Sequence, residues 1–316
     1  MLDSESMRKV LVVGDVMTDI IVRPEGRLAP GSDRRAAIRM LPGGSGANQA
    51  AWLATCGVDV TFLGRVGAED RTQQIFLLEA HGVRPVLAAD RDRPTGTLVT
   101  LLAPEGERSF LTDRGANAAL ARGDLPDALL DGIDLLHVSG YALFEPGPRA
   151  AVLDFIAEAR RRNIRFSIDP ASWSFLEEAG PENFLRWTRG ASICFPNDDE
   201  ARTLSGTPDL AAQLERLSAI YPLVIIKRGA LGAAAAEASG VRWSVDAASA
   251  AAIDTSGAGD AFLGGFLSFW LEGRDTETSL RRAVELGTRA VTILGGRPPL
   301  SCAISELDAS LPGKAP

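Results

Sequence analysis

Short hydrophobic runs alternate with longer amphipathic segments along most of the chain. The short runs are rich in branched aliphatic residues, which is typical of strands buried in a parallel sheet. Strands are predicted at residues 10–13, 60–63, 135–139, 166–169, 192–195 and 223–227. Helices are predicted at residues 47–56, 71–81, 148–162, 210–220, 260–272 and 276–294. This order predicts an α/β fold whose mainly parallel sheet is connected by crossover helices.

Two regions interrupt the alternation, residues 20–41 and residues 94–112. Both contain strand-like runs separated by turn-forming Pro, Gly and Asp, and neither contains a helical pattern. Strands with no crossover helix between them usually pair with each other, so a small antiparallel sheet is predicted beside the main one. Edge hairpins of the main sheet are the alternative.

A glycine-rich segment, Asp254-Thr255-Ser256-Gly257-Ala258-Gly259-Asp260, precedes the apolar helix predicted at 260–272. Its small residues let backbone N–H groups approach a ligand, and the start of the helix favours an anion. The carboxylate of Asp260 is unfavourable beside a phosphate unless it accepts a proton during the reaction. The segment therefore indicates phosphoryl transfer to a hydroxyl. An ordinary turn with Asp260 as the helix N-cap is the alternative.

Composition narrows the class of protein further. The chain has 316 residues, 46% of them hydrophobic, and a net charge of −8, which argues against a nucleic-acid or anionic-membrane surface. The start is polar and no run reaches the roughly 18 apolar residues of a membrane span, so a cytoplasmic protein is expected. Cys56, Cys194 and Cys302 are widely spaced and fit free thiols. His81 and His137 are the only histidines. Both are expected to be structural, so a metal site with histidine ligands is not expected.

Four motifs in the same order resemble those of the PfkB (ribokinase-like) family of sugar and nucleoside kinases. They are Gly14-Asp15-Val16-Met17-Thr18-Asp19, the segment from Gly43 to Asp70, Pro196-Asn197-Asp198-Asp199-Glu200-Ala201, and Asp254–Asp260. The resemblance implies a ribokinase-like three-layer α/β/α sandwich in a single kinase domain over residues 1–316. It also implies a β-sheet lid from about residues 20–41 and 94–112, which closes over the sugar and in some relatives carries a homodimer contact.

The resemblance also implies a reaction. Asp260 would be the general base that removes the proton of the acceptor hydroxyl. The backbone of Gly257, Ala258 and Gly259 would form the anion hole for the γ-phosphoryl group of ATP. The chain lacks the G-x-x-x-x-G-K-[ST] motif of P-loop enzymes, so the phosphate is expected to be held without that lysine.

The acceptor site is implied in the same way. Four residues match the family's contacts to the acceptor: Asp15, Asp19, Gly44 and Asn48. Ser45 stands where ribokinases carry Lys, and Gly140 where they place a sugar-binding Glu, so D-ribose is expected to be a poor substrate. Arg108 and Arg114 are candidates for binding an acidic group of the acceptor, and solvated surface arginines are the alternative.

The nucleotide and metal contacts follow from matching positions. The residues expected to contact ATP are Asn197, Lys227, Gly229, Gly257 and Gly259. Asn197 and Glu200 have the family's N-x-x-E spacing and are expected to hold Mg²⁺ through water, with Asn197 as a plain N-cap the alternative. Asp254 and Ser256 match a monovalent-cation site, for K⁺, of some relatives.

The predicted function is therefore an ATP-dependent kinase that phosphorylates a hydroxyl of a small sugar or sugar-derived acceptor. A nucleoside kinase and a non-catalytic sugar or nucleotide sensor on the same fold are the alternatives. The base Asp260 disfavours the sensor, because a protein that only binds has no use for it.

Overall fold

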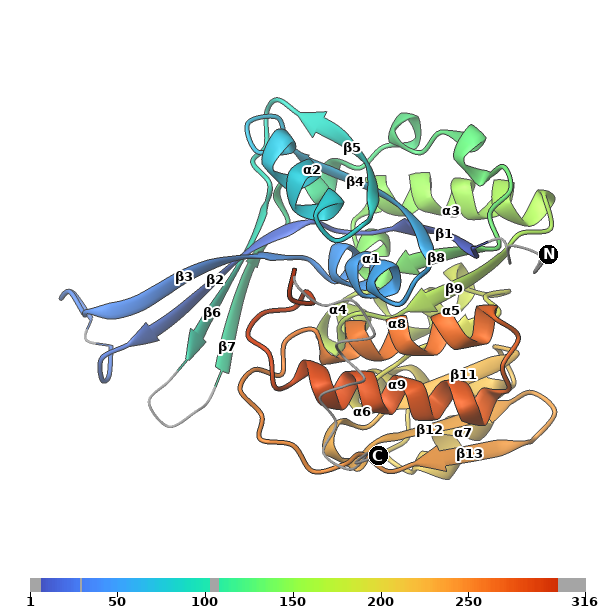
Figure 1. The fold of residues 1–316 in the computed structure, drawn as a ribbon. Coiled ribbons are helices and arrows are strands. Elements are labelled where there is room, and N and C mark those ends of the chain that lie inside the picture. Colours follow the sequence, from blue (N-terminus) through green and yellow to red (C-terminus); the bar gives the residue numbers. More distant parts are fainter. Residues whose placement is uncertain (1–6, 29, 103–107, 301–316) are drawn as a thin grey trace, which may run out of the picture.

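The computed structural model describes residues 7–28, 30–102 and 108–300. Its main sheet has nine strands in the order β13-β12-β11-β10-β9-β8-β1-β4-β5 (Figure 1). These are β1 (Lys9–Val13), β4 (Asp59–Gly67), β5 (Arg84–Asp90), β8 (Leu135–Ser139), β9 (Arg165–Asp169), β10 (Ile193–Cys194), β11 (Leu223–Lys227), β12 (Ala233–Glu237) and β13 (Arg242–Val245). Seven neighbouring strands of this sheet run parallel, namely β11, β10, β9, β8, β1, β4 and β5. At one edge, β12 pairs antiparallel with both β11 and β13. The predicted mainly parallel sheet is confirmed.

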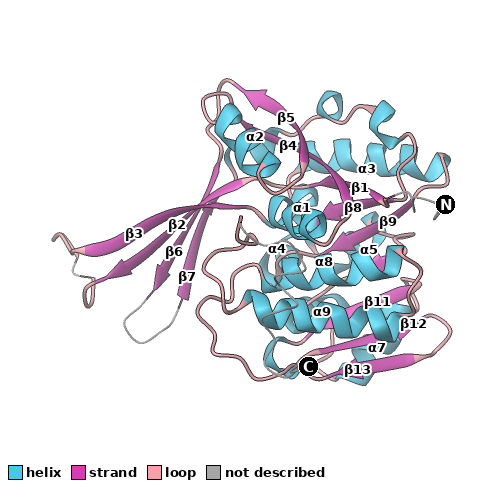
Figure 2. Cartoon of the chain, viewed as in Figure 1, coloured by secondary structure: helices cyan, strands magenta, loops and turns pink. Residues whose placement is uncertain are grey.

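Helices cover both faces of this sheet (Figure 2). One layer contains α1 (Ser45–Thr55), α2 (Arg71–Glu79), α8 (Ala258–Leu271) and α9 (Thr276–Ala290). The other contains α3 (Pro146–Arg161), α4 (Trp173–Ala179), α5 (Pro181–Trp187), α6 (Asp198–Ser205) and α7 (Leu210–Ser218). Short 3₁₀ helices lie at Gly115–Ala119, Arg122–Asp124, Asp127–Leu130, Gly140–Leu143 and Gly229–Leu231.

Alternate side chains of β1 explain the three layers. Val10 and Val12 pack into the core beneath α1, α8 and α9, whereas Leu11 and Val13 pack into the core beneath α3. A strand whose side chains are buried on both faces must lie between two layers of helix. The three-layer α/β/α sandwich is confirmed.

A second sheet of four strands projects to one side of the main sheet (Figure 1). Its order is β3 (Ala36–Gly43), β2 (Met17–Pro24), β6 (Gly96–Leu102) and β7 (Arg108–Asp113). A separate sheet was predicted from these regions, and it is present. The prediction that it is antiparallel is wrong at its centre, where β2 and β6 pair in parallel, because the chain between them returns through α1, β4, α2 and β5. Residues 103–107 lie outside the described residues.

The pattern failed to predict elements at the edges of the main sheet. The alanine run 233–236, for which no element was predicted, is the buried part of β12. The strand β12 lies between β11 and β13. Its small alanine side chains fit where the strand is buried. Cys194 is a buried free thiol, as expected, Cys56 is only partly buried, and Cys302 lies outside the described residues.

The contact between α1 and α8 is unusually close at Gly264. A Cβ at this glycine would lie 2.9 Å from Trp52 Cβ and 3.1 Å from the carbonyl carbon of Trp52. Trp52 is buried, and its indole N–H donates to the carbonyl of Gly296 at 2.9 Å. The missing side chain therefore sets the distance between the two helices.

Replacing Gly264 by Ala should push α1 and α8 apart. Overpacking typically costs about 1–3 kcal/mol, and the better helix propensity of Ala recovers up to about 1 kcal/mol. We expect urea unfolding to show a lower free energy of unfolding for Gly264→Ala. Gly147→Ala is the matched control, since Gly147 lies in the first turn of α3 with nothing within 4 Å of its added Cβ. Equal stability of the two variants would contradict this account.

Candidate active site

A cavity of about 850 Å³ lies between the inner face of the four-stranded sheet and the carboxyl ends of the central strands. In parallel sheets this edge is the usual place for ligands. Its polar lining includes Asp15, Asp19, Asn48 and Asp260. Its apolar lining comes from the four-stranded sheet (Ile21, Leu41, Leu98 and Phe110) and from Tyr141, Trp173 and Phe175. The structure thus brings the predicted acceptor residues and the predicted base to one cavity.

The glycine-rich segment forms the start of α8. Gly257 is the N-cap, with φ of 72°, and a Cβ there would lie 2.3 Å from the carbonyl oxygen of Gly296. Only glycine suits both conditions. Because α8 begins at Ala258, Asp260 lies in its first turn and the N-cap interpretation of Asp260 is wrong. The first N–H groups of a 14-residue helix have no acceptor within the helix, which makes this end suitable for an anion.

The carboxylate of Asp260 is held from α1. Ser45 Oγ donates to Oδ1 at 2.9 Å, and Asn48 Nδ2 donates to Oδ2 at 3.2 Å. Burial raises the pKa of Asp260 to about 7, and the neighbouring charge of Asp169 raises it further, while Ser45, Lys227 and Asn48 oppose the rise. A carboxylate with a pKa near neutrality can both accept a proton and release it under ordinary conditions.

Asp15 serves the local structure as well as the cavity. Its Oδ1 accepts from the N–H of Gly46 at 3.0 Å and from Ser139 Oγ at 3.3 Å. Its Oδ2 accepts from Arg114 Nη1 at 3.2 Å, and the Arg114 guanidinium stacks 4.5 Å above the centre of the Tyr141 ring. Arg114 is thus paired and largely buried rather than a solvated surface arginine, the alternative given for it. The side chain of Arg108 lies outside the described part of the structure.

Asp19 faces the cavity from β2 and is the least satisfied of its carboxylates. Its Oδ1 is buried and has no hydrogen-bond partner among the described residues. Burial raises the pKa of Asp19 to about 7, with a further rise from Asp15 and an opposing effect of Arg297. An acceptor carboxyl group with an open position is suited to a ligand hydroxyl, which can donate to it.

Arg297 is a site residue that the sequence did not reveal. It is 5% exposed; its Nη2 donates to the carbonyl of Gly43 at 3.2 Å and its Nε to Asn48 Oδ1 at 3.4 Å. Arg297, which follows α9 in the chain, therefore orients Gly43 and Asn48 of the acceptor motif. The only sequence signal was its place after the Gly295-Gly296 pair.

Backbone geometry explains two of the predicted positions. Gly44 is the N-cap of α1 with φ of 90°, and a Cβ there would lie 2.6 Å from the carbonyl oxygen of Asp15. At Gly140 a Cβ would lie 2.6 Å from the carbonyl oxygen of Asp169. The structure has no room for a side chain at residue 140 without a shift of backbone, which agrees with the absence of the ribokinase Glu.

Three charged groups, the buried Asp169 and Glu200 and the part-buried Lys227, lie near the predicted anion hole. Lys227 Nζ donates to Asp169 Oδ2 at 2.6 Å, and it lies 3.5 Å from where a Cβ of Gly259 would stand. Burial raises the pKa of Glu200 to about 7, and the charge of Lys227 opposes this. Lys227 is therefore paired, and it is also close enough to the anion hole to add positive charge there. Gly229, the other predicted ATP contact, is exposed at the start of the 3₁₀ helix Gly229–Leu231.

Asn197 and Glu200 form a capping box at the start of α6. Asn197 Oδ1 accepts from the N–H of Glu200 at 2.9 Å, and Glu200 Oε2 accepts from the N–H of Asn197 at 2.8 Å. Asn197 Nδ2 also donates to Glu200 Oε1 at 2.7 Å. Asn197 is thus the N-cap of α6, as the alternative held, and Glu200 completes the capping box. Their hard oxygen atoms, near Asp169, still suit a hydrated Mg²⁺ whose waters they would orient.

Asp254 ties the glycine-rich segment to the end of α9. Its Oδ1 accepts from the N–H of Ser256 at 3.0 Å, and its Oδ2 accepts from the N–H of Gly295 at 3.0 Å. These bonds give it a structural role, and a monovalent cation at this place stays a prediction. Within the described ranges, no group of three or more His, Cys, Asp or Glu side chains is arranged to hold a metal ion.

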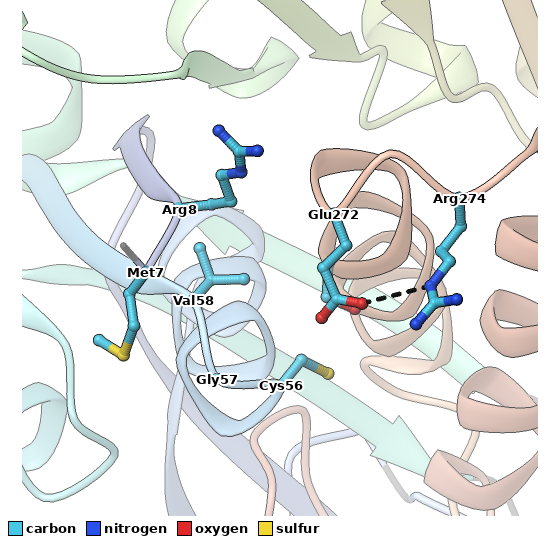
Figure 3. A pocket seen from close by; sticks show the side chains of 8 residues that line it. Met7, Arg8, Cys56, Gly57, Val58, Glu272 and Arg274 are labelled. Atoms are coloured by element: carbon cyan, nitrogen blue, oxygen red, sulfur yellow. Dashed lines mark ion pairs between the residues drawn. The ribbon is translucent and has the colours of Figure 1, made fainter. Parts of the chain in front are cut away.

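A second cavity, of about 360 Å³, lies between the start of β1 and the ends of α1 and α8 (Figure 3). Arg8, Glu272 and Arg274 line it, and Glu272 pairs with Arg274 at 3.7 Å. It brings together none of the predicted site residues. In the described ranges, no helix is both long and apolar enough to span a bilayer.

The profile of the pfkB family carbohydrate kinases matches residues 7–301. Because it covers nearly the whole chain, this match shows that the chain belongs to the PfkB family. An ATP-dependent ribose-1-phosphate kinase of Halopiger xanaduensis is 29% identical over 92% of this chain and 94% of its own length. The bifunctional protein HldE of a Shewanella species is 28% identical, and the chain spans 60% of its length.

Solved structures agree with this fold. A probable sugar kinase from Rhizobium etli superposes with a TM-score of 0.84 at 24% identity, over 96% of this chain and 98% of that one. An aminoimidazole riboside kinase from Salmonella enterica, complexed with aminoimidazole riboside and an ATP analog, superposes with a TM-score of 0.78 at 25% identity. That match covers 96% of this chain and 99% of the other. The proteins similar to this chain thus include a ribose-1-phosphate kinase and a riboside kinase.

Proposed function

We propose that the protein is an ATP-dependent phosphotransferase that phosphorylates a hydroxyl of a small sugar or sugar-derived acceptor. The observation that carries this proposal is the position of Asp260. Its carboxylate faces the cavity from the first turn of α8, beside the backbone of Gly257, Ala258 and Gly259, and its pKa lies near 7. A base beside an anion site suits transfer of a phosphoryl group to a hydroxyl.

In this proposal bound MgATP supplies the γ-phosphoryl group and part of the charge neutralisation. The N–H groups at the start of α8 bind the equatorial oxygens of that group. Lys227, with Gly229 on the following turn, adds positive charge and close backbone approach on the nucleotide side. Asn197 and Glu200 orient the waters of the metal. Asp260 takes the proton from the acceptor hydroxyl while Asp19 and Asn48 hold the neighbouring hydroxyls.

The wall of the cavity favours an acceptor that carries an apolar or aromatic group, so a nucleoside or similar riboside is the second candidate. Phe110 and Thr112 line the cavity and are exposed; the Phe110 side chain is 58% exposed. A ring of the acceptor would cover Phe110 if the sheet closes as a lid, as we propose. The ionic lining is acidic, since Arg114 is paired with Asp15, which disfavours a phosphorylated acceptor.

An acceptor screen over free pentoses and hexoses, sugar phosphates, sugar acids and nucleosides tests this choice. We expect D-ribose to have a kcat/KM at least about tenfold below the best acceptor, because the site lacks the polar groups of a ribokinase at residues 45 and 140. For an acceptor with a ring, Phe110→Ala should raise KM about tenfold and leave KM for free sugars unchanged. D-ribose as the best substrate would contradict the prediction.

Replacing Asp260 by Asn removes the base and keeps the size of the side chain. Loss of a general base typically lowers the rate by about 10²–10⁴-fold, so kcat should fall by that much. ATP affinity should change little, because the anion hole is backbone. Isothermal titration measures the ATP affinity, and steady-state kinetics measure kcat. Near wild-type turnover of the Asp260→Asn variant would refute the mechanism.

The pH dependence of the wild-type enzyme follows from the same pKa. Asp260 must be ionised to act, so kcat/KM should fall as the pH decreases through about 7.

We also propose that the outer face of the four-stranded sheet is covered by a second copy of the chain. Strand register places Ile20 beside Met40 and Val99, and Val22 beside Ile38, on the face away from the cavity. Ile38 and Met40 are 62% and 68% exposed. The inner face of this sheet is largely apolar, and so is the outer face. Exposing the outer apolar face to water is unfavourable in free energy, and contact with a second copy would remove it from water.

Met40→Lys tests this interface. We expect the variant to shift from dimer to monomer in sedimentation at micromolar concentration, while its far-UV spectrum stays unchanged. Phe76→Lys is the matched control, since Phe76 is 69% exposed on α2, away from this face. A wild-type protein that is monomeric at the same concentration would exclude the dimer.

A further inference from the structure

A continuous chain of hydrogen bonds connects Asp260 to a buried histidine. Ser45 Oγ bonds Asp260 Oδ1 at 2.9 Å, and Gln49 Nε2 bonds Ser45 Oγ at 2.9 Å. The other end of the Gln49 amide, Oε1, lies 2.9 Å from His137 Nε2, and His137 Nδ1 lies 2.8 Å from Ser167 Oγ. Gln49, His137 and Ser167 are all 0% exposed.

Four secondary-structure elements are needed to align these hydrogen bonds: α1, β8, β9 and α8. Ser45 and Gln49 are one turn apart on α1, so their side chains lie on the same face of the helix. His137 and Ser167 are direct neighbours in the parallel pair β8 and β9. The chain therefore starts inside the main sheet, passes through α1 and ends on the first turn of α8.

The direction of each bond follows from the chemistry at its end. An ionised Asp260 can only accept, so the Ser45 hydroxyl must donate to it. The Ser45 oxygen then accepts from the Gln49 amide N–H, which leaves the Gln49 carbonyl facing His137. That carbonyl needs a donor, so His137 carries its proton on Nε2 and its Nδ1 accepts from Ser167.

We propose that His137 is a positioning residue for Asp260: its tautomer fixes the direction of the Gln49 amide, and thereby keeps the Ser45 hydroxyl hydrogen on the carboxylate. The proposal rests on the proposed role of Asp260 as the base. With the opposite tautomer, the Gln49 amide would turn its oxygen towards Ser45 and draw the hydroxyl hydrogen away from Asp260.

The histidine is suited to hold one tautomer. Burial lowers the pKa of His137 to about 4; the charge of Lys227 also lowers it, and the charge of Asp169 opposes this. The ring is therefore neutral over the working range and has one N–H to place. The charged groups that act on Asp260 from the other elements are Asp169 on β9 and Lys227 on β11, and the Tyr141 phenol lies nearby. None of these three residues takes part in the series of hydrogen bonds from Asp260 to Ser167.

The test is the titration of Asp260 itself, in full-length protein labelled with [4-¹³C]aspartate and without ligand. The spectrum of Asp260→Asn identifies the Asp260 carboxyl signal. A hydrogen bond to the ionised form lowers a pKa, so Ser45→Ala should raise the midpoint by about one unit. His137→Phe and Gln49→Met should each raise it by about half a unit. Tyr221→Phe, which removes a buried hydroxyl bonded to Thr188, is the matched control and should leave it unchanged.

A midpoint in His137→Phe equal to that of wild type, with Ser45→Ala shifted, would overturn the proposal. If His137→Phe does not fold, Ser167→Ala removes a single oxygen and frees the tautomer of His137; it should shift the midpoint in the same direction, and no shift would count against the proposal. Turnover of Asp260→Asn is a separate measurement. An active Asp260→Asn variant would refute the role of the base, whereas unshifted midpoints beside an inactive one would refute only the positioning by His137.

Discussion

The packing of α8 against α1 is the constraint on which the site depends. It places the carboxylate of Asp260 between Ser45 and Asn48 and removes it from bulk water, which sets its pKa near 7. The helices can approach this closely only because residue 264 has no side chain. The packing of the two helices and the protonation of Asp260 therefore depend on the same contact, and a change in helix spacing would alter both, together with the proposed role of Asp260 as the base.

The sequence predicted the central parallel strands, many of the helices and the segments that meet at the cavity, because buried strands and glycine-rich turns leave local patterns. It did not predict the edge strands β5, β12 and β13 or the short helices α4, α5 and α6. It did not predict the parallel pairing of β2 and β6, which depends on the path of the whole intervening chain. Arg297 and the pairing of Arg114 with Asp15 were also missed. These contacts join residues far apart in the chain, and their geometry has no local pattern.

The resemblance to the PfkB family identified residue types at the site more readily than their partners. Asn48 was expected to contact the acceptor, and its amide also donates to Asp260, the proposed base. Asn197 and Glu200 were expected at the metal, and they also cap α6. Lys227 was expected at the nucleotide, and it also pairs with Asp169 near the predicted anion hole. A buried polar side chain needs hydrogen-bond partners within the protein, so the residues that could bind a ligand also bond to one another.

The four-stranded sheet carries the apolar wall of the cavity but not the proposed base or anion hole. Ile21, Leu98 and Phe110 come from this sheet, whereas Asp260 and Gly257 to Gly259 belong to the main layers. Exchanges at such positions of the four-stranded sheet would therefore change the wall of the cavity without disturbing the main core or the proposed base. Such a division of labour lets one scaffold diversify during evolution by changes confined to a small appendage.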